Sequence, residues 1–202
     1  MAYQRSALMQ ERLSENRARI LAAARQLVAE GGFRAASITA VARVSGLSTG
    51  AIYRYFPSKS VLFVEVLTSA VAHECEILTA IVDGDGSARE RLRAAVASFA
   101  RRALKGPHLA FAFIAEPADP DVEAARILCR RDFGDVFKRV LRAGMASGEF
   151  PKQSVDVGAA CIVGAFTEAL VRPVEHAGGR RSDQALVRAI VDFCDRAVGG
   201  TD

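Results

Sequence analysis

Apolar residues recur at intervals of three and four along nearly the whole chain, and this periodicity constrains the fold more than any other feature. Near the N-terminus, Ile20, Leu21, Ala24, Leu27 and Val28 follow the spacing of one helix face. No segment shows the sustained alternation of apolar and polar residues that is typical of a half-buried strand. The sequence therefore predicts an all-α fold.

Residues typical of helix ends divide the first third of this pattern into three helices. A glycine pair ends a first helix of about residues 12–30. Ser37 is placed to cap a short second helix, Gly46 to end it in the left-handed conformation, and Ser48 to cap a third helix that a proline stops. Two short helices joined by a tight glycine-containing turn form a helix-turn-helix.

Longer helical patterns occupy the rest of the chain. Ser87 and Glu90 form a capping-box pattern, and Asp119 is placed to cap a long helix that starts at Pro120. The predicted longer helices cover about residues 59–82, 87–104, 120–146, 154–172 and 182–198, with a short apolar segment at 109–115. We therefore predict a small head over residues 1–57 and a larger helical domain over residues 58–202.

Positive charge is concentrated in the first third of the chain. Residues 1–60 contain nine Lys or Arg and three Glu, whereas the remainder contains 18 basic and 20 acidic residues. A basic segment attached to a mildly acidic body favours a polyanionic partner for that segment alone. A solvated basic face without a partner is the alternative.

The composition gives no indication of a membrane span, a metal site or a cofactor. No run of about 18 apolar residues is present, and the polar segment Met1–Arg19 does not resemble a secretory signal, so a cytoplasmic location is expected. The four cysteines are dispersed and lack zinc-ligand spacing. We expect them to be buried thiols and expect no metal or cofactor.

The stretch Gly46-Leu47-Ser48-Thr49-Gly50 satisfies G-x-S-x-G, the pattern that presents a nucleophilic serine in α/β-hydrolases. That arrangement requires a buried strand before the serine, and the preceding residues have helical spacing instead. The three histidines that follow accompany no other sign of a catalytic site. Ser48 is therefore interpreted as a helix cap, and no enzyme activity is expected.

A DNA-binding interpretation accounts for the same stretch better. Ser48, Thr49 and Gly50 are small, so the N-terminus of their helix can approach base edges and phosphates closely. Tyr53, one turn further on, can reach a phosphate with its hydroxyl, although a packing role is the alternative. The residues predicted to contact DNA are Thr39, Ser48, Thr49, Gly50, Tyr53, Arg54, Tyr55 and Lys59.

The segment SITAVARVSGLSTGAIYRYFPSKSVLF, residues 37–63, resembles the DNA-binding signature of the TetR/AcrR transcriptional regulators. Tyr55 departs from the signature, which often has histidine at this position. The resemblance implies a homodimer of all-α subunits, each with a DNA-binding head and a C-terminal domain that binds a small molecule. The positions that match the signature are Ser37, Ala42, Gly46, Ser48, Gly50, Tyr53, Phe56, Ser58 and Lys59.

The resemblance assigns DNA binding to the helix-turn-helix of residues 1–57 and regulation and dimerisation to residues 58–202. The implied function is a ligand-responsive repressor that binds a palindromic operator and is released by a small apolar effector. One alternative is a small-molecule-binding protein or cryptic enzyme that uses a C-terminal cavity and has a purely structural head. Another is a non-specific nucleoid-type binder.

The aromatic residues of the C-terminal domain fall on helices that the resemblance places around a ligand cavity. Arg126 and Arg130 recur with Phe133 and Phe137 at helical spacing, which is compatible with an apolar slot that has a cationic end. The competing interpretation has both arginines exposed and paired with acids such as Glu123. The predicted ligand-binding residues are Phe99, Phe111, Phe113, Arg126, Arg130, Phe133, Phe137 and Phe166.

The last two long helices are expected to form the dimer interface. The final helix has two apolar stripes, more than one core contact requires, and the helix before it has small residues that permit close helix packing. Burial of both stripes in the core of one subunit is the alternative. The predicted interface residues are Gly158, Ile162, Ala165, Ala169, Leu186, Ile190, Phe193 and Ala197.

Overall fold

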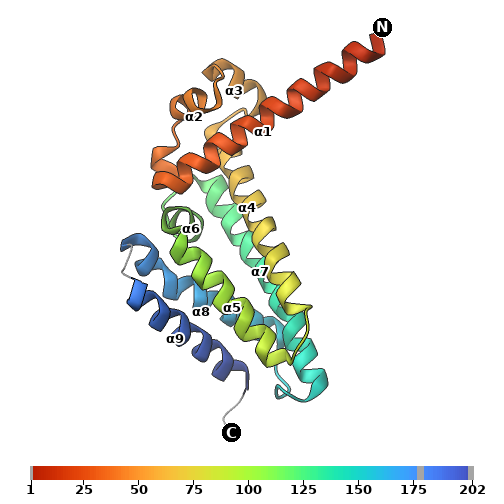
Figure 1. The fold of residues 1–202 in the computed structure, drawn as a ribbon, viewed down its shortest axis with the longest axis vertical. Helices are drawn as coiled ribbons and strands as arrows, with labels where there is room; N and C mark the ends of the chain where they lie inside the picture. The colour runs from red at the N-terminus through yellow and green to blue at the C-terminus, as the bar shows by residue number, and fades with distance from the viewer. Residues whose placement is uncertain (1, 177–179, 200–202) are drawn as a thin grey trace.

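The computed structural model describes residues 2–176 and 180–199, which form nine α-helices and no strand (Figure 1). The predicted all-α fold is therefore confirmed. The helices are α1 (Ala2–Ala35), α2 (Ile38–Ser45), α3 (Thr49–Tyr55), α4 (Lys59–Val82), α5 (Ala88–Lys105), α6 (Pro107–Ile114), α7 (Pro120–Ser147), α8 (Val155–His176) and α9 (Arg180–Gly199).

The caps of α2 and α3 form as the sequence predicts. The Ser37 hydroxyl accepts a hydrogen bond from the Ala40 amide at 3.1 Å, and the Ser48 hydroxyl accepts one from the Ala51 amide at 3.1 Å. Gly46 ends α2 with φ +67°, in the left-handed region that favours glycine. These local contacts set the turn between the two short helices.

Helix α1 differs from its predicted extent of residues 12–30, because it begins at Ala2 and ends at Ala35. The glycine pair interrupts the helical backbone at Gly31 and Gly32, but a further helical turn follows before the element ends. Gly32 has φ +73°, so the regular helix ends at the pair as predicted, and Ala2–Ala35 comprises two helical segments joined by a kink.

Asp119 precedes α7 as predicted, but its side chain makes no capping hydrogen bond. Its carboxylate instead accepts a hydrogen bond from the Ser60 hydroxyl at 2.8 Å. Glu123 accepts the nearby Ala118 amide at 3.2 Å. Asp119 therefore joins the start of α7 to the start of α4.

Helices α1, α2 and α3 form the head at one end of the molecule, and α4 runs from the head into the body (Figure 1). In the body, α4 packs on α7, α7 on α8, and α5 on α9. The buried apolar residues form one cluster that continues from Phe56 in the head through Phe63 of α4 to Phe166 of α8. The division between residues 57 and 58 stays a prediction, since α4 also packs on α1.

Candidate nucleic-acid interface and ligand cavity

Helix α3 divides into a buried face and an exposed face. Ile52 and Phe56 are fully buried and anchor the helix in the head. Thr49, Gly50 and Tyr53 are exposed, and a Cβ atom added to Gly50 would meet no heavy atom within 4 Å. The N-terminus of α3 therefore presents open backbone with small and polar side chains to the outside.

Helix α1 braces the turn before α3. Ser45 is the last residue of α2, and its carbonyl accepts a hydrogen bond from the Arg19 guanidinium at 2.6 Å. Arg17 forms an ion pair with Glu65 of α4. These contacts fix the position of the helix-turn-helix on α1 and α4.

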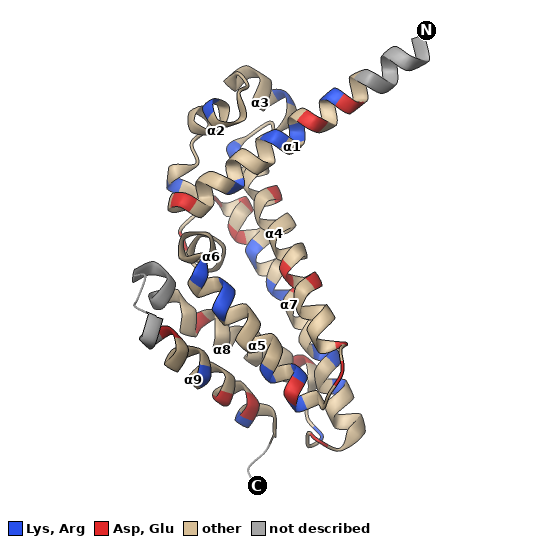
Figure 2. Ribbon diagram, in the orientation of Figure 1, with Lys and Arg blue, Asp and Glu red and all other residues tan. Residues whose placement is uncertain are grey.

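The charges of the head favour a polyanion. Neither α2 nor α3 contains an acidic residue, and their Arg43 and Arg54 are both exposed. Arginine residues also recur along α1, interspersed with glutamates (Figure 2). Because no carboxylate lies on α2 or α3, phosphates can approach α3 without like-charge repulsion from these two helices.

Two of the predicted DNA contacts have partners inside the protein. Tyr55 is half-buried, packs on the core, and its hydroxyl accepts a hydrogen bond from the Asn16 amide at 3.3 Å. Its predicted contact with DNA stays a prediction. Lys59 is half-buried with its Nζ atom 5.0 Å from the centre of the Phe63 ring, while Thr39 is exposed.

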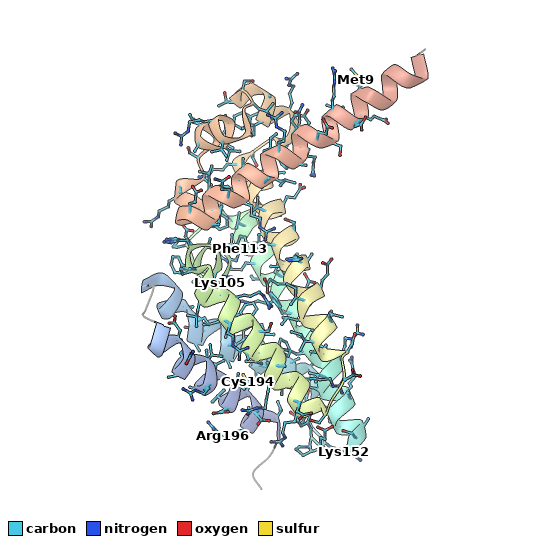
Figure 3. The ribbon with its side chains drawn as sticks, viewed as in Figure 1. Met9, Lys105, Phe113, Lys152, Cys194 and Arg196 are labelled. Atoms are coloured by element: carbon cyan, nitrogen blue, oxygen red, sulfur yellow. The ribbon has the colours of Figure 1, made fainter. Side chains whose placement is uncertain are left out.

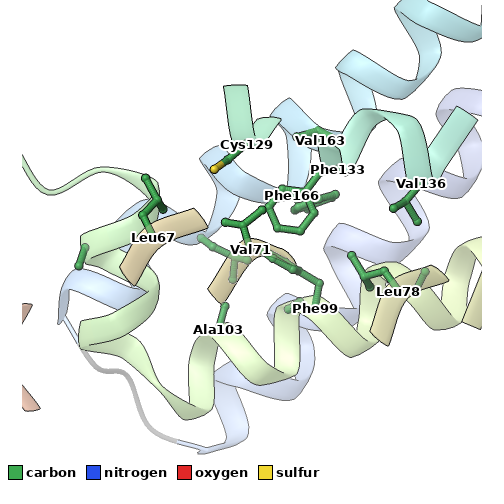
Figure 4. Packing of buried hydrophobic residues seen from close by; sticks show 14 of the residues in the cluster. Leu67, Val71, Leu78, Phe99, Ala103, Cys129, Phe133, Val136, Val163 and Phe166 are labelled. Atoms are coloured by element: carbon green, nitrogen blue, oxygen red, sulfur yellow. The ribbon is translucent and has the colours of Figure 1, made fainter. Parts of the chain in front are cut away.

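A cavity of about 130 Å³ lies in the body between α4, α5, α6 and α7. Its apolar wall includes Val71, Phe99 and Phe133, which point toward one another in Figure 4. Phe113 of α6, seen between head and body in Figure 3, also lines it. The cavity therefore offers an apolar interior close to the head.

Two polar contacts lie in the wall of this cavity, one half-buried and one around the buried Arg126. Arg102 donates from Nε to the Glu74 carboxylate at 2.8 Å. Arg126 is only 6% exposed and donates to the Glu123 carboxylate at 2.5 Å and to the Ala112 carbonyl at 2.9 Å. Its Nε atom is buried without a hydrogen-bond partner among the described residues.

The cavity wall is connected to the kink of α1 through Glu116. The Arg126 guanidinium donates to the Glu116 carbonyl at 2.8 Å. The buried Glu116 carboxylate accepts the Phe33 amide at 2.8 Å and the Arg34 amide at 3.3 Å. A Cβ atom on Gly32 would lie 2.5 Å from this carboxylate, so the close approach requires glycine. No pattern in the sequence links residues so far apart.

Cys129 is a titratable residue of the cavity lining. Burial raises the pKa of the Cys129 thiol to about 11, so this lining residue is a neutral thiol at neutral pH. Within the described part of the chain, no three His, Cys, Asp or Glu residues are grouped so that they could hold a metal ion. None of the described helices has both the length and the apolar content needed to cross a membrane.

Comparison with known families identifies both parts of the chain. The profile described as bacterial regulatory proteins, tetR family, matches residues 20–66, and the profile described as tetracyclin repressor-like, C-terminal domain, matches residues 85–198. The chain belongs to the TetR family. The family membership expected from residues 37–63 is therefore confirmed.

Curated relatives of this TetR-family chain include the HTH-type transcriptional repressor KstR of Mycolicibacterium smegmatis. It is 34% identical over 124 residues, which cover 59% of each chain. KstR of Rhodococcus jostii is 45% identical over 62 residues, which cover 31% of this chain and 27% of the relative. The matched region thus spans less than two thirds of each relative's length.

A solved structure with the same fold is that of the transcriptional regulator FadR from Bacillus subtilis in complex with stearoyl-CoA. It superposes with a TM-score of 0.73 and 20% identity, covering 91% of this chain and 98% of the other. At this identity the likeness establishes the fold alone.

Five of the eight predicted ligand-binding residues line the cavity of this TetR-family chain. Phe111, Phe137 and Phe166 are not among the lining residues. Phe137 and Phe166 are fully buried with ring centres 5.4 Å apart, so they pack in the core rather than line the cavity. The predicted residues that do line it are Phe99, Phe113, Arg126, Arg130 and Phe133.

The predictions for Arg126 and Arg130 and for the other polar residues of the cavity need correction. Arg130 is exposed, but Arg126 is buried even though it pairs with Glu123 as the competing interpretation expected. The sequence reasoning missed Arg25, Glu74, Arg102 and Thr167, which also line the cavity. Arg25 belongs to α1, and nothing in its local pattern indicates a contact with the body.

The predicted dimer residues on α8 and α9 separate into buried and accessible groups. Ile162 and Ile190 are 1% and 5% exposed within one subunit, although Ile162 also lines the groove between α8 and α9, so their place in the interface stays a prediction. Phe193 is 55% exposed, and Ala169 and Ala197 are exposed. Gly158, Ala165 and Leu186 are half-buried.

An apolar groove lies between the accessible faces of α8 and α9. Phe193 and Ala197 line it from α9, and Val157, Cys161 and Ala165 line it from α8. Val157 is 61% exposed, although nothing in the sequence analysis singled it out. This face therefore leaves a continuous apolar surface uncovered in the single subunit.

Proposed function

We propose that this protein is a ligand-responsive transcriptional repressor that acts in the cytoplasm. It binds a palindromic operator as a homodimer and is released by a small apolar effector. The observation that carries this proposal is the exposed N-terminus of α3, where Gly50 faces open space and Ile52 is fully buried. A helix anchored on one side and open at its N-terminus suits the major groove.

In this proposal, α3 reads base edges while residues around it bind phosphates. Thr49 and Gly50 allow close approach of the α3 backbone to DNA, and the half-exposed Tyr53 reaches a phosphate with its hydroxyl. Lys59 supplies a cation at the start of α4. Arg54 and Thr39 contribute further contacts with the DNA backbone from the same exposed surface.

The apolar groove between α8 and α9 is the proposed dimer surface. A second copy would cover Phe193 and Val157, which are more than half exposed in the single subunit. A two-fold dimer presents two α3 helices to half-sites about 34 Å apart. The palindromic operator follows from this symmetry.

The cavity is the proposed effector site. Its apolar wall suits an apolar ligand, and the contacts from Arg126 through Glu116 to α1 give a physical connection to the head. An effector that changes the packing of this connection would change the separation of the two α3 helices. The structure of FadR with stearoyl-CoA supports the view that this fold accommodates a ligand with a long apolar chain.

The test measures binding of the purified protein to DNA from upstream of its own gene and to the same sequence scrambled, over a salt titration. The proposal expects preference for the upstream DNA, and weaker binding after Tyr53→Phe and Lys59→Ala. Lys152→Ala is the matched control for Lys59, because Lys152 is exposed at the end of the body away from the head (Figure 3).

Equal binding to both DNAs would contradict sequence-specific repression and favour a non-specific nucleoid-type binder. Absence of DNA binding would favour the alternative of a small-molecule-binding protein or cryptic enzyme with a structural head. An unchanged affinity in both head variants would refute the proposed placement of Tyr53 and Lys59.

A further inference from the structure

The cavity carries more positive than negative charge. Four arginines line it, Arg25 from α1, Arg102 from α5, and Arg126 and Arg130 from α7, together with one carboxylate, that of Glu74. Within the lining itself, the Glu74 carboxylate offsets one of these four cations.

Two of the four arginines are already engaged. Arg102 is paired with Glu74, and Arg126 is paired with Glu123 and donates to two backbone carbonyls. Among the side chains that the structure describes, Arg25 and Arg130 form no ion pair with a carboxylate. The unmatched charge of the cavity therefore resides on these two.

Arg25 and Arg130 are the two lining arginines that are exposed to solvent, and we call them the mouth of the cavity. Both line it and both are exposed, whereas Phe99 and Phe133 of its apolar wall are 8% and 7% exposed. The cavity thus has an apolar interior and a cationic mouth. A molecule that matches both ends has an apolar body and an anionic group.

We propose that the effector is an amphipathic anion whose apolar body occupies the cavity and whose carboxylate or phosphate is bound by Arg130 and Arg25. This inference rests on the proposed function and names its ligand class. A guanidinium forms charge-assisted hydrogen bonds with either anion, often in bidentate geometry. A cationic ligand meets two unmatched positive charges at the mouth, and a neutral one leaves both arginines without a partner.

The position of Arg25 gives this ligand a direct contact with the DNA-binding head. Arg25 is on α1, which also holds the helix-turn-helix through Arg19, whereas Arg130 is on α7 of the body. An anion bound by both arginines joins head and body across the mouth of the cavity. Ligand occupancy is thereby coupled to the position of α1.

The test compares three probes of equal chain length, octanoate, octanol and octylamine, by calorimetry on the full chain. The expected order places octanoate tightest. Arg25→Gln and Arg130→Gln are each expected to lower the affinity for octanoate about tenfold and leave octanol unchanged. Arg131→Gln is the matched control, because Arg131 is an exposed neighbour of Arg130 outside the cavity lining.

A second readout tests the contact with the head. Saturating octanoate is expected to weaken operator binding by wild type and to have a much smaller effect on Arg25→Gln. Equal release of both proteins would overturn the role of Arg25.

Equal affinity for the three probes, a preference for octylamine, or an equal loss of octanoate and octanol binding in the arginine variants would overturn the ligand class. Binding of none of the three would also overturn it. The proposed function fails separately, because DNA binding without any ligand is measured on its own.

Discussion

Removal of the Glu116 carboxylate is expected to destabilise the contact between the body and α1. This buried side chain accepts the amides of Phe33 at 2.8 Å and Arg34 at 3.3 Å. Hydrogen bonds to charged groups contribute about 1.5–3 kcal/mol each, and an unpaired buried amide costs about 1–3 kcal/mol. Because Phe33 is 5% exposed, Glu116→Ala is expected to lower the free energy of unfolding by about 2–4 kcal/mol.

Urea unfolding at fixed protein concentration measures this change, since the proposed dimer would make stability depend on concentration. The control Glu76→Ala removes an exposed carboxylate from α4 and is expected to change stability by less than about 0.5 kcal/mol. A loss from Glu116→Ala no larger than that of the control would refute the reasoning.

A double-mutant cycle with Gly32 separates the carboxylate contact from backbone strain. Gly32→Ala adds a Cβ atom 2.5 Å from the Glu116 carboxylate and also strains a backbone with φ +73°. In a Glu116→Ala background the close contact is absent, so the same substitution is expected to cost less. Strict additivity of the two losses would show that the two side chains do not interact as the structure indicates.

Three further predictions concern the head, the dimer surface and a buried thiol. Gly50→Ala is expected to raise the free energy of unfolding by up to about 1 kcal/mol, because its Cβ atom meets open space within a helix. The same substitution is expected to weaken operator binding. The control Gly134→Ala, also in open space but on α7, should leave DNA binding unchanged in the same assays. Phe193→Asp places a charge in the apolar groove and is expected to shift the protein from dimer to monomer in sedimentation velocity, whereas a variant that stays dimeric would place the interface elsewhere. Burial raises the pKa of the Cys129 thiol from 9.0 to about 11. The protonated thiol therefore contributes to the free energy of unfolding in full below pH 9, and this contribution to stability is lost as the pH rises through 11. Alkylation of Cys129 in the folded protein, followed by mass spectrometry, should accordingly be slow at pH 9 and faster near pH 11, and rapid reaction at pH 8 would contradict the assigned burial.

The helix-turn-helix was predictable because its contacts are short in sequence. Ser37 and Ser48 each cap an amide three residues away, and Gly46 takes its left-handed conformation within a single turn. Ile52 and Phe56 are four residues apart, a spacing that places both on one face of a helix, and both are fully buried. The hydrogen bond of Tyr55 was not predictable, because its partner, Asn16, lies on another helix.

The ligand-binding residues were predicted only in part because helical spacing does not distinguish a cavity wall from a filled core. Phe133 and Phe137 are one turn apart on the buried side of α7, yet only Phe133 lines the cavity. Phe137 packs against Phe166 instead. The same ambiguity applies to Ile190, which was predicted in the dimer interface and is 5% exposed within its own subunit.

The sequence by itself determined the all-α fold and the exposed N-terminus of α3, because helical periodicity and helix caps act over a few neighbouring residues. Only the tertiary structure decided that Glu116 binds the amide of Phe33, which lies 83 residues away. It alone also brought Arg25 of the head to the mouth of the cavity beside α7. Such contacts depend on how the helices pack, and the local pattern around either partner does not specify that packing.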